Sequence, residues 1–185
     1  MVFYHKKKIF IPLTIHIEIK KVYKSFQNKI LMSKKIENLY YTLVNDFKIT
    51  KPKMILAGIN PHAGENKTIS KDDNKYLLPI INLLKKRGLF IDGPVSGDGM
   101  INNQNLNYYD AFIFTYHDQA LIPFKILSNY QGVNFTSNLD IIRVSPSHGT
   151  AENLIGSKKV ISNGIINCFN LIKKINRNRN KIDSS

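Results

Sequence analysis

The chain has 185 residues, of which 43% are hydrophobic and 10% aromatic, and it carries a formal net charge of +14. This length suits one domain with a substantial core, and the composition excludes disordered and collagen-like proteins. The single cysteine, Cys168, excludes a disulfide framework and is typical of a reducing compartment, so we expect a cytoplasmic location.

The excess of positive charge is concentrated near the two ends of the chain. Residues 1–53 carry 12 Lys/Arg against 3 Asp/Glu, and residues 173–185 carry 5 against 1, whereas residues 54–172 carry 10 against 9. A nucleic-acid groove would instead place basic residues on the folded surface with aromatic residues between them. We therefore interpret the charge as solvated ends and expect no nucleic-acid or membrane partner, with attraction to phosphate or membrane as the alternative.

The N-terminal segment does not have the pattern of a secretion signal. Its lysines precede an apolar stretch, but Pro12 and His16 interrupt that stretch, and no small-residue cleavage site follows. No stretch of the chain reaches the roughly 18–20 apolar residues that cross a bilayer. We interpret residues 1–11 as a basic lead-in to the domain and residues 176–185 as a basic polar tail.

The first half of the chain predicts a strand, a helical region, a second strand and a helix. The first strand covers residues 9–17, and helical periodicity follows over residues 18–47, with Leu39, Leu43 and Phe47 on one face. A buried strand over residues 53–59 ends at an Asn-Pro break. Residues 72–88 form an amphipathic helix with acidic residues at its start, basic residues at its end and Gly88 as its stop.

The second half predicts four strands and a closing helix. The strands are "LFIDGP", "DAFIFTY", "GVNFT" and "DIIRVS", and the helix covers residues 157–175. Alternating strands and helices predict an α/β fold with a largely parallel sheet. In such sheets ligands bind beyond the carboxyl ends of the strands, so polar residues that follow strands are candidates for a site.

Three of the five histidines, His16, His62 and His117, follow predicted strands. Neutral imidazole binds zinc and similar divalent ions well, and three such ligands leave a coordination position open for chemistry. Hydrogen-bonded packing histidines are the open alternative, because the sequence does not show that the three converge. Asp98 and Asp118 are candidate catalytic residues that could orient ligands or transfer protons, although Asp98 could equally hold its glycine-rich turn.

Lys125, Asn134 and Arg143 interrupt apolar segments. A buried charge costs several kcal/mol unless it is paired, so this pattern favours an anionic ligand such as phosphate. Arginine binds phosphate through two hydrogen bonds, and a salt bridge of Arg143 is the alternative. A His-Gly-Thr-Ala turn in "SPSHGTAENLIG" would let backbone N–H groups approach a phosphate or adenosine group, although such turns also cap helices and GxGxxG is missing.

Taken together, several motifs resemble one family. "PLTIHIEIKKV", "GINPHAGE", "GPVSGDG", "YHDQALIPFK", "GVNFT" and "IIRVSPSHGTAENLIG" resemble the C-terminal half of the 4-hydroxythreonine-4-phosphate dehydrogenases, the NAD-dependent enzymes of pyridoxal 5′-phosphate biosynthesis. The resemblance covers about residues 12–175. It implies an isocitrate/isopropylmalate dehydrogenase-like α/β domain with a mostly parallel sheet flanked by helices, a truncated N-terminal lobe, and a homodimer.

The resemblance also implies roles for individual residues. His16, His62 and His117 would bind a divalent metal (Zn, Mg or Co) at a site shared between subunits, and Lys125, Asn134 and Arg143 would bind a phosphorylated substrate. The NAD adenosine would lie against His148, Gly149, Thr150, Ala151 and Asn153. The implied reaction oxidises 4-phosphooxy-L-threonine by hydride transfer to NAD and then releases CO2, leaving 3-amino-2-oxopropyl phosphate.

The chain departs from the family pattern at three places. The family has roughly another half-chain before residue 1, the loop after "NPHAGE" reads "NKTISKDDNKY" in place of glycines and paired glutamates, and Ser147 replaces an aspartate. We therefore expect the metal-binding and phosphate-contact residues to be kept while the substrate pocket is incomplete. The alternative is a non-catalytic remnant, or a subunit that needs a missing N-terminal half.

Overall fold

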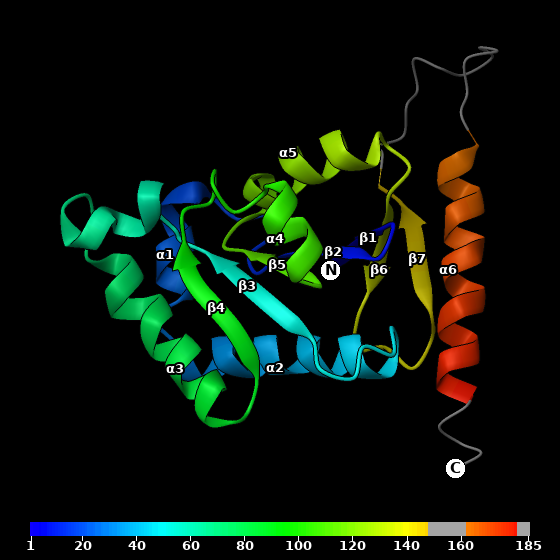
Figure 1. Ribbon diagram of the computed structural model, residues 1–185, viewed down its shortest axis with the longest axis horizontal. Coiled ribbons are helices and arrows are strands. Elements are labelled where there is room, and N and C mark those ends of the chain that lie inside the picture. Colours follow the sequence, from blue (N-terminus) through cyan, green and yellow to red (C-terminus); the bar gives the residue numbers. More distant parts are fainter. Residues whose placement is uncertain (148–161, 181–185) are drawn as a thin grey trace.

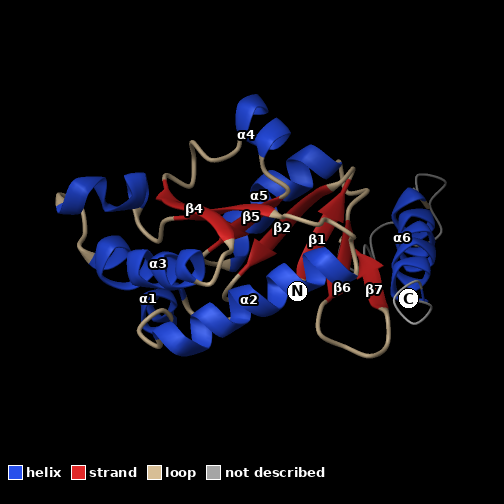
Figure 2. Cartoon of the chain, turned by 60° about the horizontal axis from the view of Figure 1, so that its bottom comes forward, coloured by secondary structure: helices blue, strands red, loops and turns tan. Residues whose placement is uncertain are grey.

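The computed structural model describes residues 1–147 and 162–180. Within them, one seven-stranded sheet has the order β4-β3-β5-β2-β1-β6-β7 and is covered by helices on both faces (Figures 1 and 2). The strands are β1 (Val2–His5), β2 (Lys8–Pro12), β3 (Lys53–Ala57), β4 (Phe90–Val95), β5 (Ala111–Phe114), β6 (Val133–Thr136) and β7 (Arg143–Pro146).

The sheet combines a parallel half with an antiparallel half. The pairs β4–β3, β3–β5 and β5–β2 are parallel, whereas β2–β1, β1–β6 and β6–β7 are antiparallel. Five of the seven strands therefore run in the same direction, and β1 and β7 run against them. The expected α/β fold with a mostly parallel sheet is confirmed.

The expected lead-in over residues 1–11 is corrected, because these residues form β1 and β2 inside the sheet. Val2, Ile9 and Phe10 are buried, Lys6 and Lys7 form the hairpin turn with left-handed φ angles of 44° and 68°, and Lys8 begins β2. The lysine run interrupts the apolar pattern in the sequence and so conceals the first strand. The domain therefore includes the residues at the start of the chain.

The helices match the sequence pattern except at two places, the first of which is the short unpredicted helix over Asn103–Tyr108. The predicted helical region over residues 18–47 forms two main helices. The predicted helix over residues 72–88 begins with a π-helical turn and ends before Gly88. However, the segment from His117 to Ser128, which contains Pro123, is a helix that the sequence analysis did not predict. The helices are α1 (Val22–Ser25), α2 (Lys29–Asn45), α3 (Leu78–Lys86), α4 (Asn103–Tyr108), α5 (His117–Ser128) and α6 (Asn163–Asn180).

The core is divided by the sheet into two clusters. On one face, aliphatic side chains of the strands pack against α2, α3 and α6, as in the contacts around Leu43, Leu56 and Ile175. On the other face, Phe10 stacks on Phe112 and Phe114 with ring centroids 5.2 Å and 5.6 Å away. In the described part of the chain, no helix is both long and apolar enough to cross a membrane.

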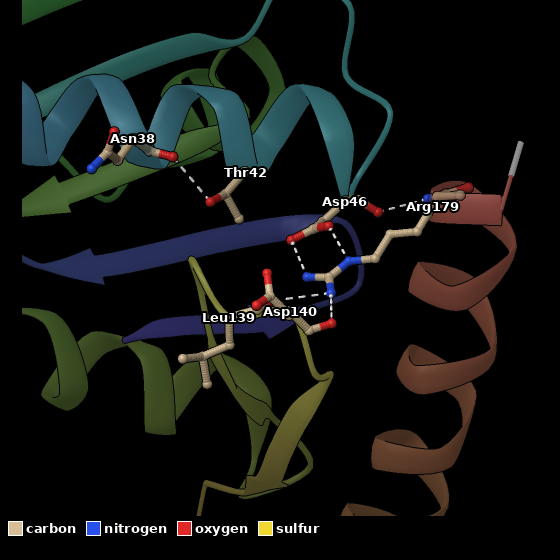
Figure 3. Close-up of polar contacts among 7 residues, drawn as sticks. Asn38, Thr42, Asp46, Leu139, Asp140 and Arg179 are labelled. Atoms are coloured by element: carbon tan, nitrogen blue, oxygen red, sulfur yellow. Dashed lines mark hydrogen bonds and ion pairs between the residues drawn. The ribbon is translucent and has the colours of Figure 1, made fainter. Parts of the chain in front are cut away.

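Arg179 fastens α6 to the rest of the domain (Figure 3). Its Nε and Nη2 donate to the carboxylate of Asp46 at 2.7 Å and 3.1 Å, and its Nη1 donates to the carbonyl oxygens of Leu139 and Asp140 at 3.1 Å and 2.9 Å. The bonds to Asp46 raise the pKa of the guanidinium group. The expected polar tail from residue 176 is therefore corrected, since helix α6 continues to Asn180 and is anchored there.

Replacing Arg179 by Ala should lower the free energy of unfolding by about 2 kcal/mol, because Asp46 would be left nearly buried without its partner. Chemical denaturation measures the change. Arg177→Ala is the matched control, since Arg177 is an exposed arginine two residues earlier in the same helix. Equal losses in the two variants would contradict the anchoring role.

Candidate functional site

The parallel half of the sheet brings the three predicted histidines to one edge. Strands β3, β5 and β2 are neighbours that run in the same direction, and His62, His117 and His16 follow their carboxyl ends in that order. Backbone pairing between β2 and β5 continues past the strands, because Thr14 donates to the Thr115 carbonyl from both its N–H (3.2 Å) and its hydroxyl (2.7 Å). This pairing holds the two following loops together.

His16 and His117 lie next to each other in a small open pocket. Their ring centroids are 5.5 Å apart, and the pocket has a volume of about 200 Å³. His117 is the first residue of α5, and its Nδ1 is 2.6 Å from Oδ1 of Asp118. If Nδ1 donates a hydrogen bond to this carboxylate, Nε2 carries the free lone pair of the ring.

His62 lines a second pocket that adjoins the first. This pocket, of about 430 Å³, shares Tyr116 and Asp118 with the His16–His117 pocket and includes Asp98. The hydroxyl of Ser96 and then the backbone N–H of Gly99 lower the pKa of Asp98, and the nearby His62 contributes in the same direction. Asp98 is therefore a carboxylate at neutral pH, which can accept a proton but not donate one.

The three histidines do not form a metal cluster within one chain. Among residues 1–147 and 162–180, no group of three or more His, Cys, Asp or Glu side chains is arranged to hold a metal ion. The structure thus brings together His16 and His117, and places His62 with Asp98 in the pocket beside them.

Gln119 connects the two histidine loops and was not singled out in the sequence. Its Oε1 accepts from the backbone N–H and the hydroxyl of Thr115 at the end of β5, each at 2.9 Å. Its Nε2 donates to the carbonyl oxygen of Gly58, just before the His62 loop, at 2.9 Å. The polar residues after "FIFTY" therefore have different roles. His117 and Asp118 line the pockets, whereas Gln119 links the ends of neighbouring strands.

The loop that carries His62 has an unusual backbone. Residues 62–67 all have positive φ angles, between 43° and 80°, although only Gly64 is a glycine. The left-handed conformation costs roughly 1–2 kcal/mol for each non-glycine residue, so other contacts must hold it. Asn66 and Lys67, the first two residues of the segment "NKTISKDDNKY", take two of these positions.

Asp73 provides such contacts and was also missed, because the sequence suggested only an acidic helix start. It is fully buried, and its two carboxylate oxygens accept from the Ile59 N–H at 2.6 Å and from Asn60 Nδ2 at 2.8 Å. An added Cβ at Gly58 would lie 2.7 Å from the same carboxylate, so this approach requires glycine. The Asp-Asp pair shortly after "NPHAGE" is the signal that could have indicated this role.

The predicted substrate residues lie on three elements. Asn134 of β6 and Arg143 of β7 share a face of the sheet, because Asn134 pairs with Ser145 and Thr136 pairs with Arg143. Arg143 is exposed and donates to the Thr136 hydroxyl at 3.0 Å, and it forms no ion pair with Asp140 within the described residues. Lys125 belongs to the third element, in the last turn of α5.

Asn134 has an unpaired polar atom that points to a binding role. Its Nδ2 lies 3.5 Å from the Ser145 hydroxyl, but its Oδ1 is buried and accepts no hydrogen bond from the part of the chain that the structure describes. An unsatisfied buried acceptor costs about 1–3 kcal/mol, which a donor on a ligand would recover. The predicted NAD contacts, His148, Gly149, Thr150, Ala151 and Asn153, lie outside the described residues.

These features define an α/β protein whose candidate site is built on loops after parallel strands. The sequence model described as "Pyridoxal phosphate biosynthetic protein PdxA" matches residues 1–172, and the chain belongs to that family. The match begins at residue 1, in agreement with the position of β1 in the sheet.

Individual relatives agree with this assignment. The 4-hydroxythreonine-4-phosphate dehydrogenase of Zymomonas mobilis is 39% identical over 149 residues, which cover 80% of this chain and 44% of the relative. That of Paracoccus denitrificans is 36% identical over 146 residues, or 79% and 45% of the two chains. The crystal structure of the Klebsiella pneumoniae enzyme superposes with a TM-score of 0.80 at 29% identity, over 94% of this chain and 53% of that one. The chain spans about half the length of the curated relatives that it matches.

Replacing Asp73 by Asn should loosen the His62 loop, because an amide NH2 would face one of the two donors that the carboxylate now accepts. The free energy of unfolding should fall by about 1–3 kcal/mol, and hydrogen exchange at the Ile59 amide should accelerate. Asp72→Asn makes the same change at the adjacent residue, whose side chain does not bond the loop. Unchanged protection of Ile59 in Asp73→Asn would refute the assignment.

Proposed function

We propose that the chain carries the metal- and phosphate-binding half of a 4-hydroxythreonine-4-phosphate dehydrogenase. The reaction is oxidation of the hydroxyl group of 4-phosphooxy-L-threonine with NAD as hydride acceptor, followed by loss of CO2 to leave 3-amino-2-oxopropyl phosphate. Membership of the family supports this proposal. The observation that carries it is the pairing of His16 with His117 at the ends of parallel strands.

The donor set suits a divalent metal that prefers imidazole. Zinc and cobalt bind histidine nitrogen readily, whereas magnesium prefers oxygen ligands, so the first two fit these side chains better. His16, His62 and His117 would hold the ion, which when bound supplies a Lewis acid that polarises a substrate oxygen. Because one chain holds no three-ligand cluster among its described residues, we propose that a second copy completes the ligand set in a homodimer.

The other residues would orient the substrate and move protons. Arg143 and Asn134 offer hydrogen bonds to a phosphorylated substrate, and Lys125 adds a positive charge from α5. Asp118 orients the ring of His117, and the ionised Asp98 can accept a proton beside His62. Binding of NAD by residues 148–153 and a cytoplasmic location remain predictions from the sequence.

The alternative is a subunit, or a non-catalytic remnant, that binds metal but needs an N-terminal half. The chain spans 45% and 44% of the length of the two relatives, so the experiment that tests this alternative supplies an N-terminal half. NADH formation from 4-phosphooxy-L-threonine separates the two, measured for the chain alone and with the N-terminal half of the Zymomonas mobilis relative, each with and without Zn²⁺ or Co²⁺. Turnover by the chain alone supports the enzyme, and turnover only with the added half supports the subunit. Metal binding without turnover in either mixture supports the remnant.

Replacing His117 by Ala should abolish stoichiometric binding of zinc or cobalt, because His16 would lose its neighbouring imidazole. Metal content after gel filtration, together with cobalt titration, provides the measurement. His5→Ala removes a histidine that lines neither of the two pockets and should leave metal content unchanged. Full metal content in His117→Ala would refute the metal site.

Replacing Arg143 by Ala should weaken binding of a phosphorylated substrate analogue by about tenfold or more, since a charge-assisted hydrogen bond is lost. The same analogue without its phosphate should bind the two proteins with nearly equal affinity. Calorimetric titration of both analogues gives the comparison. If both lose affinity equally, Arg143 does not contact phosphate.

A further inference from the structure

A further cavity, lined by both polar and apolar side chains, lies between the β1–β2 hairpin, β6 and α6. Its volume is about 260 Å³, and it shares no lining residue with the two histidine pockets. The hairpin contributes His5 and Lys6, and helix α6 contributes Asn167, Asn170 and Lys174. Neither the family match nor the proposed reaction explains this cavity.

The cavity wall carries positive charge without a counter-ion. Lys6 and Lys174 line it, and no Asp or Glu does so among the described residues. Lys174 lies 3.4 Å from the Tyr4 hydroxyl and 5.1 Å from the centre of its ring, which positions the ammonium group without neutralising it. Lys6 is exposed and has no ion pair in the described part of the chain. Arg179, farther along the same helix, is by contrast paired with Asp46.

Neutral donors accompany these charges. The side-chain amide of Asn167 donates to the carbonyl oxygen of Gln131 at 2.8 Å, which joins α6 to the opposite wall. The side-chain amides of Asn170 and Gln131 also line the cavity and make no hydrogen bond within residues 1–147 and 162–180. Ammonium groups together with amide N–H donors are the groups that recognise phosphate oxygens. Burial, and then Lys6, lower the pKa of His5 against the effect of a hydrogen bond to the Gln131 backbone, so the His5 ring is a neutral group of the lining.

We propose that this cavity is an anion site that binds a small phosphate group. Its volume is below the roughly 300–1,000 Å³ of pockets for drug-sized ligands, so inorganic phosphate or a small phosphate monoester fits better than a nucleotide. The site is separate from Arg143 and Asn134 and does not depend on the proposed reaction.

Calorimetric titration with inorganic phosphate, and separately with phosphoserine, tests the proposal in the Arg143→Ala protein, where phosphate binding at the candidate substrate site is weakened. Saturable binding is expected, with Lys6→Gln weakening it by about tenfold or more because a charge-assisted contact is lost. The matched control is Lys7→Gln, which removes the same charge from the neighbouring exposed turn residue outside the cavity. Its affinity should stay within about twofold of the parent protein.

Two results would overturn the proposal. The first is the absence of saturable binding of either compound, and the second is an equal loss in Lys6→Gln and Lys7→Gln, which would indicate diffuse attraction to a basic surface. Preference for phosphoserine over inorganic phosphate would identify a phosphorylated metabolite as the ligand, and the reverse would identify the free ion. If Lys6→Gln lowers the melting temperature of the protein, the Lys174→Gln variant is titrated in its place. Shifts of the Asn170 and Gln131 side-chain amide signals on adding phosphate then locate the binding.

Discussion

The parallel pairing of β3, β5 and β2 is the constraint on which the candidate site depends. Parallel neighbours end at the same edge of a sheet, so residues from three distant parts of the chain meet there. The burial of Phe10, Phe112 and Phe114 between the sheet and α5 fixes these strands. The position of the site therefore follows from core packing.

Two polar side chains then fix the geometry of the segments that follow these strands. Gln119 ties the end of β5 to the segment after β3, and Asp73 holds the segment that leads into the left-handed loop. Both act through backbone groups, which have no alternative hydrogen-bond partner once they are buried. The position of His62 is thus determined by residues that have no chemical role of their own.

Sequence reasoning predicted those features that local patterns of residues determine. The apolar runs of β3 and β5 and the periodicity of α2 and α3 predict their elements, and the ordered motifs indicate the family. Strand β1 was missed because three lysines stand in its hairpin, and α5 was missed because Pro123 interrupts its pattern. The roles of Asp73 and Gln119, and the proximity of His16 to His117, depend on tertiary contacts that no local pattern encodes. The ion pair of Arg179 with Asp46 is of the same kind, since it joins residues 133 positions apart.

Strand β1 has a consequence for the order in which the protein assembles. It lies between β2 and β6, with Val2 opposite Phe135, so the parallel and antiparallel halves of the sheet are joined through residues at the very start of the chain. During synthesis the edge of β1 that pairs with β6 stays unpaired until more than a hundred further residues have been added. Such high contact order slows folding and leaves a sheet edge open to pairing with other chains. Until β6 is made, the nascent protein therefore exposes the edge of β1 to such pairing.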